Sequence, residues 1–314
     1  MTTLLRVFQE AAEHGTAAVE NGVEQAASHA AEGGAPDIGG MLMHHLVDAQ
    51  VLELPLLGEV ALPRWAPIHL GPLTIDLSPT KHVVFMALAA ILVAILFISI
   101  SRAVTGKYHG KAPGGISNAF EGLILYFRDE IVRRNIGHGA DGFTPYILTV
   151  FFFILTMNLL GLLPWGSSAT GNLSVTAAMA IMSLIVIEVS GFFALGPGGY
   201  AKTIFFAPKG MGPVGTALML VIMTPVELLG KLAKPFALAI RLFANMTAGH
   251  TVILSLIGLI FVFGDVAGIR WGVAGGAVGM SLAMMLLELF VAFLQAYIFA
   301  MLTSVFIGLI RHAH

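Results

Sequence analysis

Apolar residues along this chain gather in long runs, which shorter polar stretches separate. The runs that are long enough to cross a bilayer cover residues 82–101, 143–164, 173–196, 212–263 and 272–310. A helix rises about 1.5 Å per residue, so about 20 apolar residues cover the roughly 30 Å of hydrocarbon in a bilayer. The pattern therefore predicts an all-α, polytopic membrane protein with five membrane-crossing helices.

A sixth helix is predicted between the first two spans, over residues 116–135. Apolar residues recur there every three to four positions, at Phe120, Leu123, Ile124, Phe127 and Ile131. The opposite face is charged and carries Glu121, Arg128, Asp129, Arg133 and Arg134. One apolar and one charged face are typical of a helix that lies on the membrane surface. We therefore predict one interfacial amphipathic helix over residues 116–135.

The last two runs are longer than an upright crossing requires. Residues 212–263 begin with a lead-in that Pro225 and Glu227 interrupt, and we interpret this lead-in as tilted. As a helix, residues 272–310 would measure about 58 Å, whereas a bilayer with its headgroups is about 40–45 Å thick. We therefore expect the last two helices to form a long, tilted, antiparallel hairpin that is joined near residues 264–271.

The amino-terminal 80 residues lack such runs. Residues 1–40 are rich in Ala, Gly and Glu, and prolines and glycines interrupt the apolar residues of 41–80. Such a segment has little apolar surface to bury. We predict an outer-side (periplasmic), partly disordered segment over residues 1–80 and a membrane domain over residues 81–314.

Composition supports the membrane assignment. Hydrophobic residues make up 57% of the chain and charged residues only 11%, whereas soluble domains carry about 25% charged residues. The absence of cysteine excludes disulfides, thiolate metal sites and cysteine nucleophiles. We expect no catalytic residue, no metal, no cofactor and no nucleic-acid partner.

The distribution of Lys and Arg predicts the orientation in the membrane. With the amino terminus outside, eleven of these residues fall on inner segments and four on outer segments. Cytoplasmic segments of membrane proteins carry the excess of positive charge. We therefore expect a periplasmic amino terminus and a cytoplasmic carboxy terminus.

Arg241 is the most unusual residue in the apolar runs. It lies in the fourth span. On a translocon scale, insertion of a cation at the centre of a membrane helix costs about 2.5–3.5 kcal/mol. Arginine stays charged, because its pKa exceeds about 12. Further polar residues lie in or near the spans at Asn158, Glu188, Glu227, Lys234, Asn245, His250, Glu288 and Gln295. Such residues usually face a protein interior or mark an ion route.

The sequence spacing of these residues predicts which of their side chains lie close together. Arg241 and Asn245 are four residues apart and share a helix face. In an antiparallel hairpin, facing residues have a nearly constant sum of residue numbers. That sum is 536 for Arg241 and Gln295 and 538 for His250 and Glu288, so one register brings both pairs level. A histidine beside a glutamate forms a plausible proton-exchanging pair.

Structural interpretations stay open for several of these residues. Asn158 could bond a neighbouring helix backbone, and Glu188 could be a buried acid that makes one interhelical bond. Glu227 could form a local ion pair with Lys231 or Lys234 instead of lying on a proton route. Both lysines also suit anchors at the inner membrane surface.

The motif Arg-Leu-Phe-x-Asn-x-x-Ala-Gly, which runs from Arg241 to Gly249, resembles subunit a of the F-type ATP synthases. The stretch Leu287–Thr303 resembles that family's last helix, and Met157–Pro164 resembles its second crossing. The resemblance covers the chain from about residue 80 to its end. It implies a multi-pass protein of the bacterial inner membrane that contacts membrane lipids, a c-subunit ring, the subunit b peripheral stalk and other ATP synthase subunits.

The resemblance also implies roles in proton translocation. Arg241 would face the c ring between two aqueous half-channels, with Asn245 and Gln295 in support. His250, Glu288 and Asn158 would line the outer half-channel, and Glu227 would lie on the inner route. Lys234 and Glu188 are further candidates.

The chain departs from many bacterial relatives in the resembling segments. They have an acid in place of Gly161, and their acid and imidazole are exchanged relative to His250 and Glu288. The exchange keeps one acid and one imidazole, and this pair favours H⁺ over Na⁺. Glu188 has no counterpart, so it either widens the outer channel or is structural.

Two other functions compete with this interpretation. An independent ion-coupled secondary transporter predicts internal repeats and broken helices in both halves, and we find no repeat in the sequence. A structural membrane scaffold would use Arg241 only to bond a partner subunit. Replacement of Arg241 by alanine discriminates between these functions.

Overall fold

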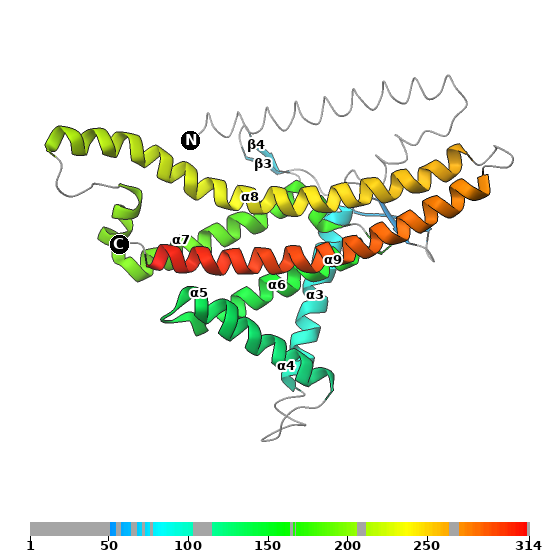
Figure 1. Ribbon diagram of the computed structural model, residues 1–314, viewed down its shortest axis with the longest axis horizontal. Helices are drawn as coiled ribbons and strands as arrows, with labels where there is room; N and C mark the ends of the chain where they lie inside the picture. Colours follow the sequence, from blue (N-terminus) through cyan, green and yellow to red (C-terminus); the bar gives the residue numbers. More distant parts are fainter. Residues whose placement is uncertain are drawn as a thin grey trace. The chain divides into compact units, whose positions relative to one another are not determined.

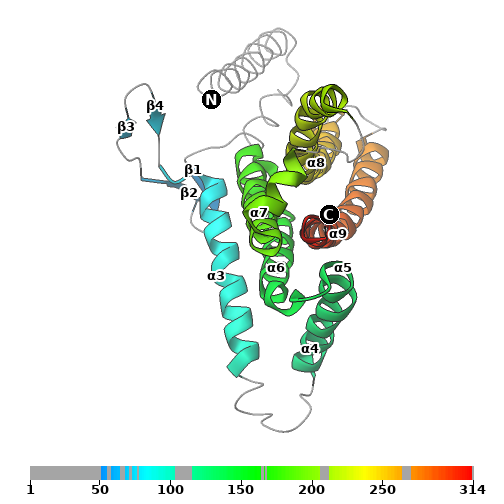
Figure 2. The same cartoon turned by 90° about the vertical axis from the view of Figure 1, so that its left-hand side faces the viewer.

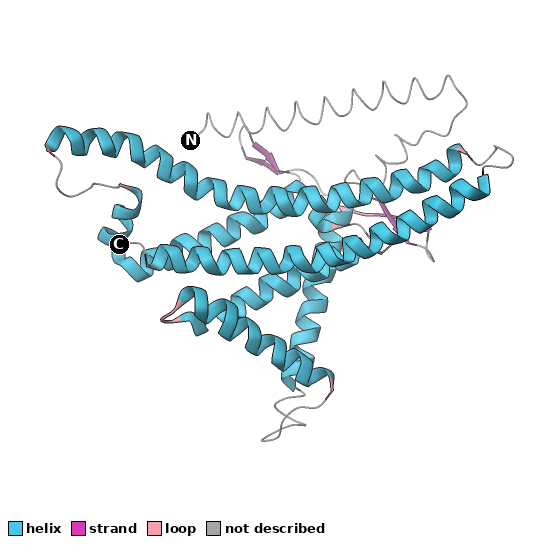
Figure 3. Ribbon diagram, in the orientation of Figure 1, coloured by secondary structure: helices cyan, strands magenta, loops and turns pink. Residues whose placement is uncertain are grey.

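The computed structural model describes residues 51–54, 58–63, 68–70, 73–75, 78–102, 115–163, 166, 168–205, 212–263 and 270–312. Helices account for most of them (Figure 3). The amino-terminal part of the predicted 1–80 segment, residues 1–50, lies outside the described residues.

Five described helices are long and apolar enough to cross a membrane. They are α3 (Lys81–Arg102), α6 (Thr144–Gly161), α7 (Leu173–Ile204), α8 (Pro213–Val262) and α9 (Arg270–Arg311), which Figure 1 shows in sequence colours. The predicted all-α, multi-pass membrane domain with five crossing helices is confirmed. Helix α8 continues through Pro225 and Pro235, so the predicted lead-in and the Arg241 segment belong to one helix.

Two short β-hairpins precede α3, and the sequence analysis missed them. Strand β1 (Val51–Leu54) pairs antiparallel with β2 (Gly58–Ala61), and β3 (Ile68–Leu70) pairs antiparallel with β4 (Leu73–Ile75). Strands of three or four residues are too short for an alternating pattern to stand out between prolines and glycines.

The predicted helix over residues 116–135 is confirmed. It consists of α4 (Ile116–Tyr126), the π-helical segment η2 (Phe127–Arg133) and α5 (Arg134–Ile136), which follow one another without a break. One face is buried and carries Phe127, Ile131, Val132 and Ile136. This helix is not among the five spanning candidates, and its place at the membrane surface stays a prediction.

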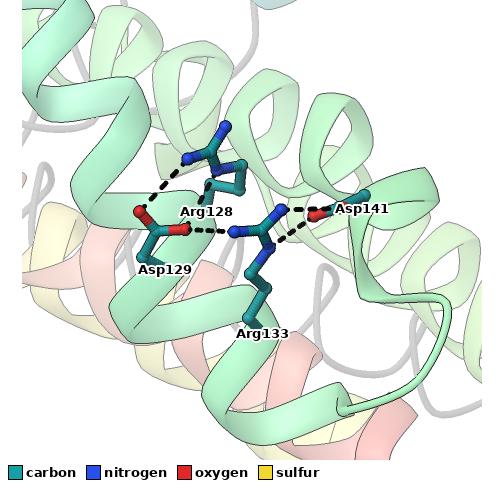
Figure 4. Close-up of polar contacts among 4 residues, drawn as sticks. All are labelled: Arg128, Asp129, Arg133 and Asp141. Carbon is teal, nitrogen blue, oxygen red and sulfur yellow. Dashed lines mark hydrogen bonds and ion pairs between the residues drawn. The ribbon is translucent and has the colours of Figure 1, made fainter.

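The charged face of that helix forms a network of exposed ion pairs (Figure 4). Arg133 binds Asp129 at 2.9 Å and binds Asp141 of the short helix η3 (Ala140–Phe143) at 2.7 Å. Arg128 binds the same Asp129 at 3.0 Å. The Arg128 guanidinium, with Arg133 beside it, lowers the pKa of Asp129 below its ordinary value of 3.8. The network thus links η2 to the segment that leads into α6.

The chain divides into two compact units. The first contains residues 1–49 and 247–288, and the second contains residues 50–246 and 289–314. In the first unit, the described residues are the end of α8 and the beginning of α9. In the second unit, α3 packs against α6 (Figure 2). Aromatic rings fill the core there, with centroids of Phe127 and Phe151 4.5 Å apart and of Phe97 and Phe152 5.1 Å apart.

Two glycines shape the second unit. Gly308 of α9 lies so close to α5 that a Cβ atom there would be 1.9 Å from the carbonyl oxygen of Asn135. Gly196 has φ 69° and ψ 171°, and Pro197 follows it, so α7 is kinked at this point. The positive φ is accessible to glycine at little cost. The kink turns the end of α7, residues 197–204, away from the axis of its longer first part.

Candidate functional site

Arg241 lies on α8 and is partly exposed, one residue before the buried Leu242. Asn245 is one turn further and is exposed, whereas Gln295 of α9 is buried. Among the described residues, the ion pairs of the membrane-spanning helices join Glu188 to Lys231 and His250 to Glu288, and neither includes Arg241. The predicted level pairing of Arg241 with Gln295 stays a prediction.

His250 and Glu288 form a direct pair within the first unit. The Nδ1 atom of His250 lies 2.7 Å from Oε1 of Glu288, although the residues are 38 positions apart. The predicted register is therefore confirmed for this pair. A contact this short lets one proton move between imidazole and carboxylate without an intervening water.

The Glu288 carboxyl group is almost fully buried. Its side chain is 4% exposed, and its second oxygen, Oε2, is buried without a hydrogen-bond partner among the described residues. A buried oxygen without a hydrogen-bond partner is rare, because burial of an unpaired polar atom costs free energy. Gly249 permits the arrangement, because a Cβ atom there would lie 2.7 Å from Oε1 of Glu288.

Asn158 of α6 lies in a buried hydrogen-bond network in the second unit. Its Nδ2 atom donates to the carbonyl oxygen of Ala292 on α9 at 3.2 Å, and its Oδ1 accepts from the Thr170 hydroxyl at 2.8 Å. The side chain is 2% exposed. Asn158 therefore bonds a neighbouring helix backbone, which is the structural interpretation that the sequence left open.

Glu188 is part of a cluster that joins α7 to α8. Its Oε2 atom accepts from Lys231 Nζ at 3.0 Å and from the Tyr200 hydroxyl at 2.5 Å. Lys231 also contacts the hydroxyl of Thr203 at 3.3 Å and lies 4.7 Å from the centre of the Tyr200 ring. Sequence reasoning missed Tyr200 and Thr203, because only the α7 kink brings them back to Glu188.

A cavity of about 250 Å³ adjoins this cluster. Its charged lining comes from Glu188 of α7 and from Glu227, Lys231 and Lys234 of α8. Liquid water occupies about 30 Å³ per molecule, so this space holds several waters. Its apolar lining includes Phe306, and Lys234 Nζ lies 5.2 Å from the centre of that ring. The cavity thus has room for several waters and brings two carboxylates and two ammonium groups together.

Gly161 has no room for the acid that many relatives are expected to carry. A Cβ atom there would lie 2.5 Å from Cε of Met246 and 2.5 Å from Cβ of Ser168. Contacts below 3.0 Å are essentially never seen for real Cβ atoms. An acid at this position would therefore require rearrangement of both neighbours.

Comparison with known proteins decides the family. Residues 83–308 match the family model for the ATP synthase A chain. This chain belongs to the family of ATP synthase subunit a. It is 45% identical over 317 aligned positions to ATP synthase subunit a of Anaeromyxobacter dehalogenans (strain 2CP-C), a match that covers 96% of this chain and 78% of the relative.

Two further relatives agree with this assignment. ATP synthase subunit a 2 of Chlorobaculum tepidum is 43% identical over 274 positions, which cover 86% of this chain and 72% of the relative. ATP synthase subunit a of Chlorobium phaeobacteroides (strain BS1) is 41% identical over 310 positions, with 96% and 86% covered. The family that the Arg241 motif suggested, subunit a of the ATP synthases, is therefore confirmed.

Proposed function

We propose that this chain is the proton-translocating stator subunit a of an F-type ATP synthase and has no catalytic role of its own. One observation carries the proposal. A permanent cation, Arg241, lies on α8 between two sets of titratable side chains: Glu227 precedes it by 14 residues at a cavity lined by charged groups, and His250 follows it by nine residues in a direct pair with Glu288.

The counter-charge of Arg241 comes, in this proposal, from a carboxylate on each subunit of a rotating c ring. Burial against lipid raises the pKa of such a carboxyl group, and a nearby guanidinium lowers it. A carboxyl group that passes Arg241 must therefore release a proton and regain one afterwards. The absence of Arg241 from the ion pairs of the described spanning helices supports this role.

Two half-channels supply and remove the protons. We assign His250 and Glu288 to the outer one and Glu227 to the inner one, with Asn245 and Gln295 beside Arg241. Asn158 belongs beside the outer route as a positioning residue, because both ends of its amide are bonded. We assign Lys234 to the inner side, and Glu188 too in place of the outer channel that the sequence suggested for it, since both line the cavity with Glu227. The His250–Glu288 pair favours H⁺ over Na⁺.

The remaining partners follow from the same proposal. The chain would lie in a bacterial inner membrane with its amino terminus in the periplasm and its carboxy terminus in the cytoplasm. It would assemble with the c ring, with the subunit b peripheral stalk and with the other ATP synthase subunits. Large exposed apolar side chains on α8 and α9, such as Leu218, Phe236, Leu286 and Phe290, suit lipid or a partner helix.

ATP-driven proton pumping by the assembled complex tests the proposal. Arg241→Ala should abolish pumping in membrane vesicles, whereas Lys202→Gln, which removes an exposed positive charge from α7, should pump normally. Equal amounts of assembled complex must be compared. Normal pumping by the Arg241→Ala complex would contradict the stator function and favour a structural scaffold. Proton flux by the purified chain without partner subunits would favour the secondary transporter.

A further inference from the structure

Lys231 has two glutamates within reach of its position, and it binds the one that is distant in sequence. Glu227 precedes it by four residues on α8, and a glutamate four residues before a lysine is the favourable orientation for a helical ion pair. The Lys231 ammonium instead lies 3.0 Å from Glu188 of α7. Glu227 is exposed at the cavity.

Two further contacts hold the ammonium on the α7 side, and a third holds Glu188 in place. The Thr203 hydroxyl lies 3.3 Å away, and the Tyr200 ring lies 4.7 Å away in a cation–π contact. The Tyr200 hydroxyl donates to the same Glu188 oxygen and fixes it. The Lys231 side chain is only 10% exposed, so these contacts are screened less by water than those of a surface lysine.

The kink of α7 makes this arrangement possible. Glu188 precedes the kink at Gly196, whereas Tyr200 and Thr203 follow it. The turned end of the helix brings both residues back to Glu188 and Lys231. Helix α7 thus contributes Glu188, Tyr200 and Thr203 to this site, and helix α8 contributes Lys231.

Among the described residues, two helices contribute the charged and titratable groups near Glu227. From α8 they are Lys231 and Lys234, and from α7 they are Glu188 and Tyr200 behind Lys231. Helix α9 contributes only apolar side chains to the cavity wall, namely Phe306, Leu309 and Ile310. Lys234 contacts the Phe306 ring. Lys231 is therefore the cation whose position decides how strongly the charge of Glu227 is compensated.

We propose that Glu188 is a positioning residue that holds Lys231 away from Glu227 and so keeps Glu227 free to take up and release protons at the cavity. The inference rests on the proposed role of Glu227 on the inner route. Without Glu188, Lys231 would pair with Glu227 and stabilise its ionised form. Glu227 would then accept a proton less readily, and proton uptake along the inner route would slow.

Three variants of the assembled complex test this inference by ATP-driven proton pumping in vesicles. Glu188→Gln should slow pumping several-fold at pH 8, because the Lys231 ammonium released from Glu188 would pair with Glu227 four residues before it and disfavour its protonation. The defect should shrink at pH 6, because a higher proton concentration competes better with the Lys231 ammonium for the Glu227 carboxylate. Glu188→Gln combined with Lys231→Gln should pump at the rate of Lys231→Gln alone. Glu188→Asp, which keeps the charge, should pump within about twofold of the wild type.

A structural clamp between α7 and α8 gives a different result. The double variant would then be no better than Glu188→Gln, and the defect would be the same at pH 6 and pH 8; either outcome overturns the inference. Rates are normalised to assembled complex, so a loss of assembly is not mistaken for slow transfer. Glu227→Gln separates the two proposals: if it pumps normally, the inner role of Glu227 fails, whereas a normal rate for Glu188→Gln alone overturns only the role of Glu188.

Discussion

Gly308→Ala tests the contact that fixes α9 against α5. The added Cβ atom would lie 1.9 Å from the carbonyl oxygen of Asn135, whereas ordinary van der Waals contact begins at 3.4 Å. The difference between these distances requires a retreat of about 1.5 Å. Because the obstacle is backbone and not the end of a flexible side chain, the helix itself must move.

The cost follows from the bonds that this movement breaks. The Ser304 hydroxyl donates to the carbonyl oxygen of Ile131 at 3.1 Å, and a ring nitrogen of His312 bonds the carbonyl oxygen of Ile136 at 3.1 Å. Each such bond contributes about 1 kcal/mol, and overpacking costs about 1–3 kcal/mol. Gly308→Ala should therefore destabilise the fold by about 3–5 kcal/mol.

Thermal unfolding of the purified chain in detergent, followed by circular dichroism, measures this loss. Gly122→Ala is the matched control, because Gly122 lies on α4, in the same continuous helix as Asn135, with open space around its Cβ position. Alanine is favoured over glycine in a helix by about 1 kcal/mol, so this control should unfold at the same or a higher temperature. Equal stability of the Gly308→Ala variant and the wild type would refute the close contact between α9 and α5.

Three further predictions concern the outer pair, the buried amide and the exposed network. Gly249→Ala should slow ATP-driven proton pumping in vesicles several-fold, because the Glu288 carboxyl group must move about 0.7 Å to reach ordinary contact and so leaves its short bond to the imidazole; unchanged pumping would contradict the role of the pair. Asn158→Ala should lower the unfolding free energy by about 2 kcal/mol, since two buried hydrogen bonds are lost, and an unchanged thermal midpoint would show that these bonds contribute nothing. Asp129 has a lowered pKa in the folded chain, so its ion pairs stabilise the fold above its ordinary value of 3.8, and this contribution disappears as the pH falls through the lowered pKa. The stability difference between wild type and Asp129→Asn should accordingly vanish in acid. A difference that grows on acidification would contradict a lowered pKa of Asp129 in the folded chain.

The sequence predicted the parts of the fold that depend on long-range hydropathy. Each spanning helix is an apolar run of at least 18 residues, and the helix over residues 116–135 has a regular apolar spacing. Both signals are strong because many residues contribute to them. Each of the strands β1 to β4 has only three or four residues, so no comparable signal exists for the two hairpins.

The site was predictable where one helical register decides it. The contact of His250 with Glu288 follows from antiparallel geometry alone, and the structure confirms it. The partner of Lys231 did not follow from local spacing, which favoured Glu227. A single glycine with positive φ, Gly196, redirects the end of α7, and no periodic pattern encodes that turn.

Proton-driven ATP synthesis by an Arg241 variant tests the central claim most directly. Vesicles with assembled complex are given an imposed proton gradient, and ATP formation is compared for wild type, Arg241→Lys and Arg241→Ala. The account predicts no synthesis with alanine and strongly reduced synthesis with lysine, because a point charge does not replace the planar guanidinium. Synthesis at the wild-type rate by the Arg241→Ala complex would contradict it.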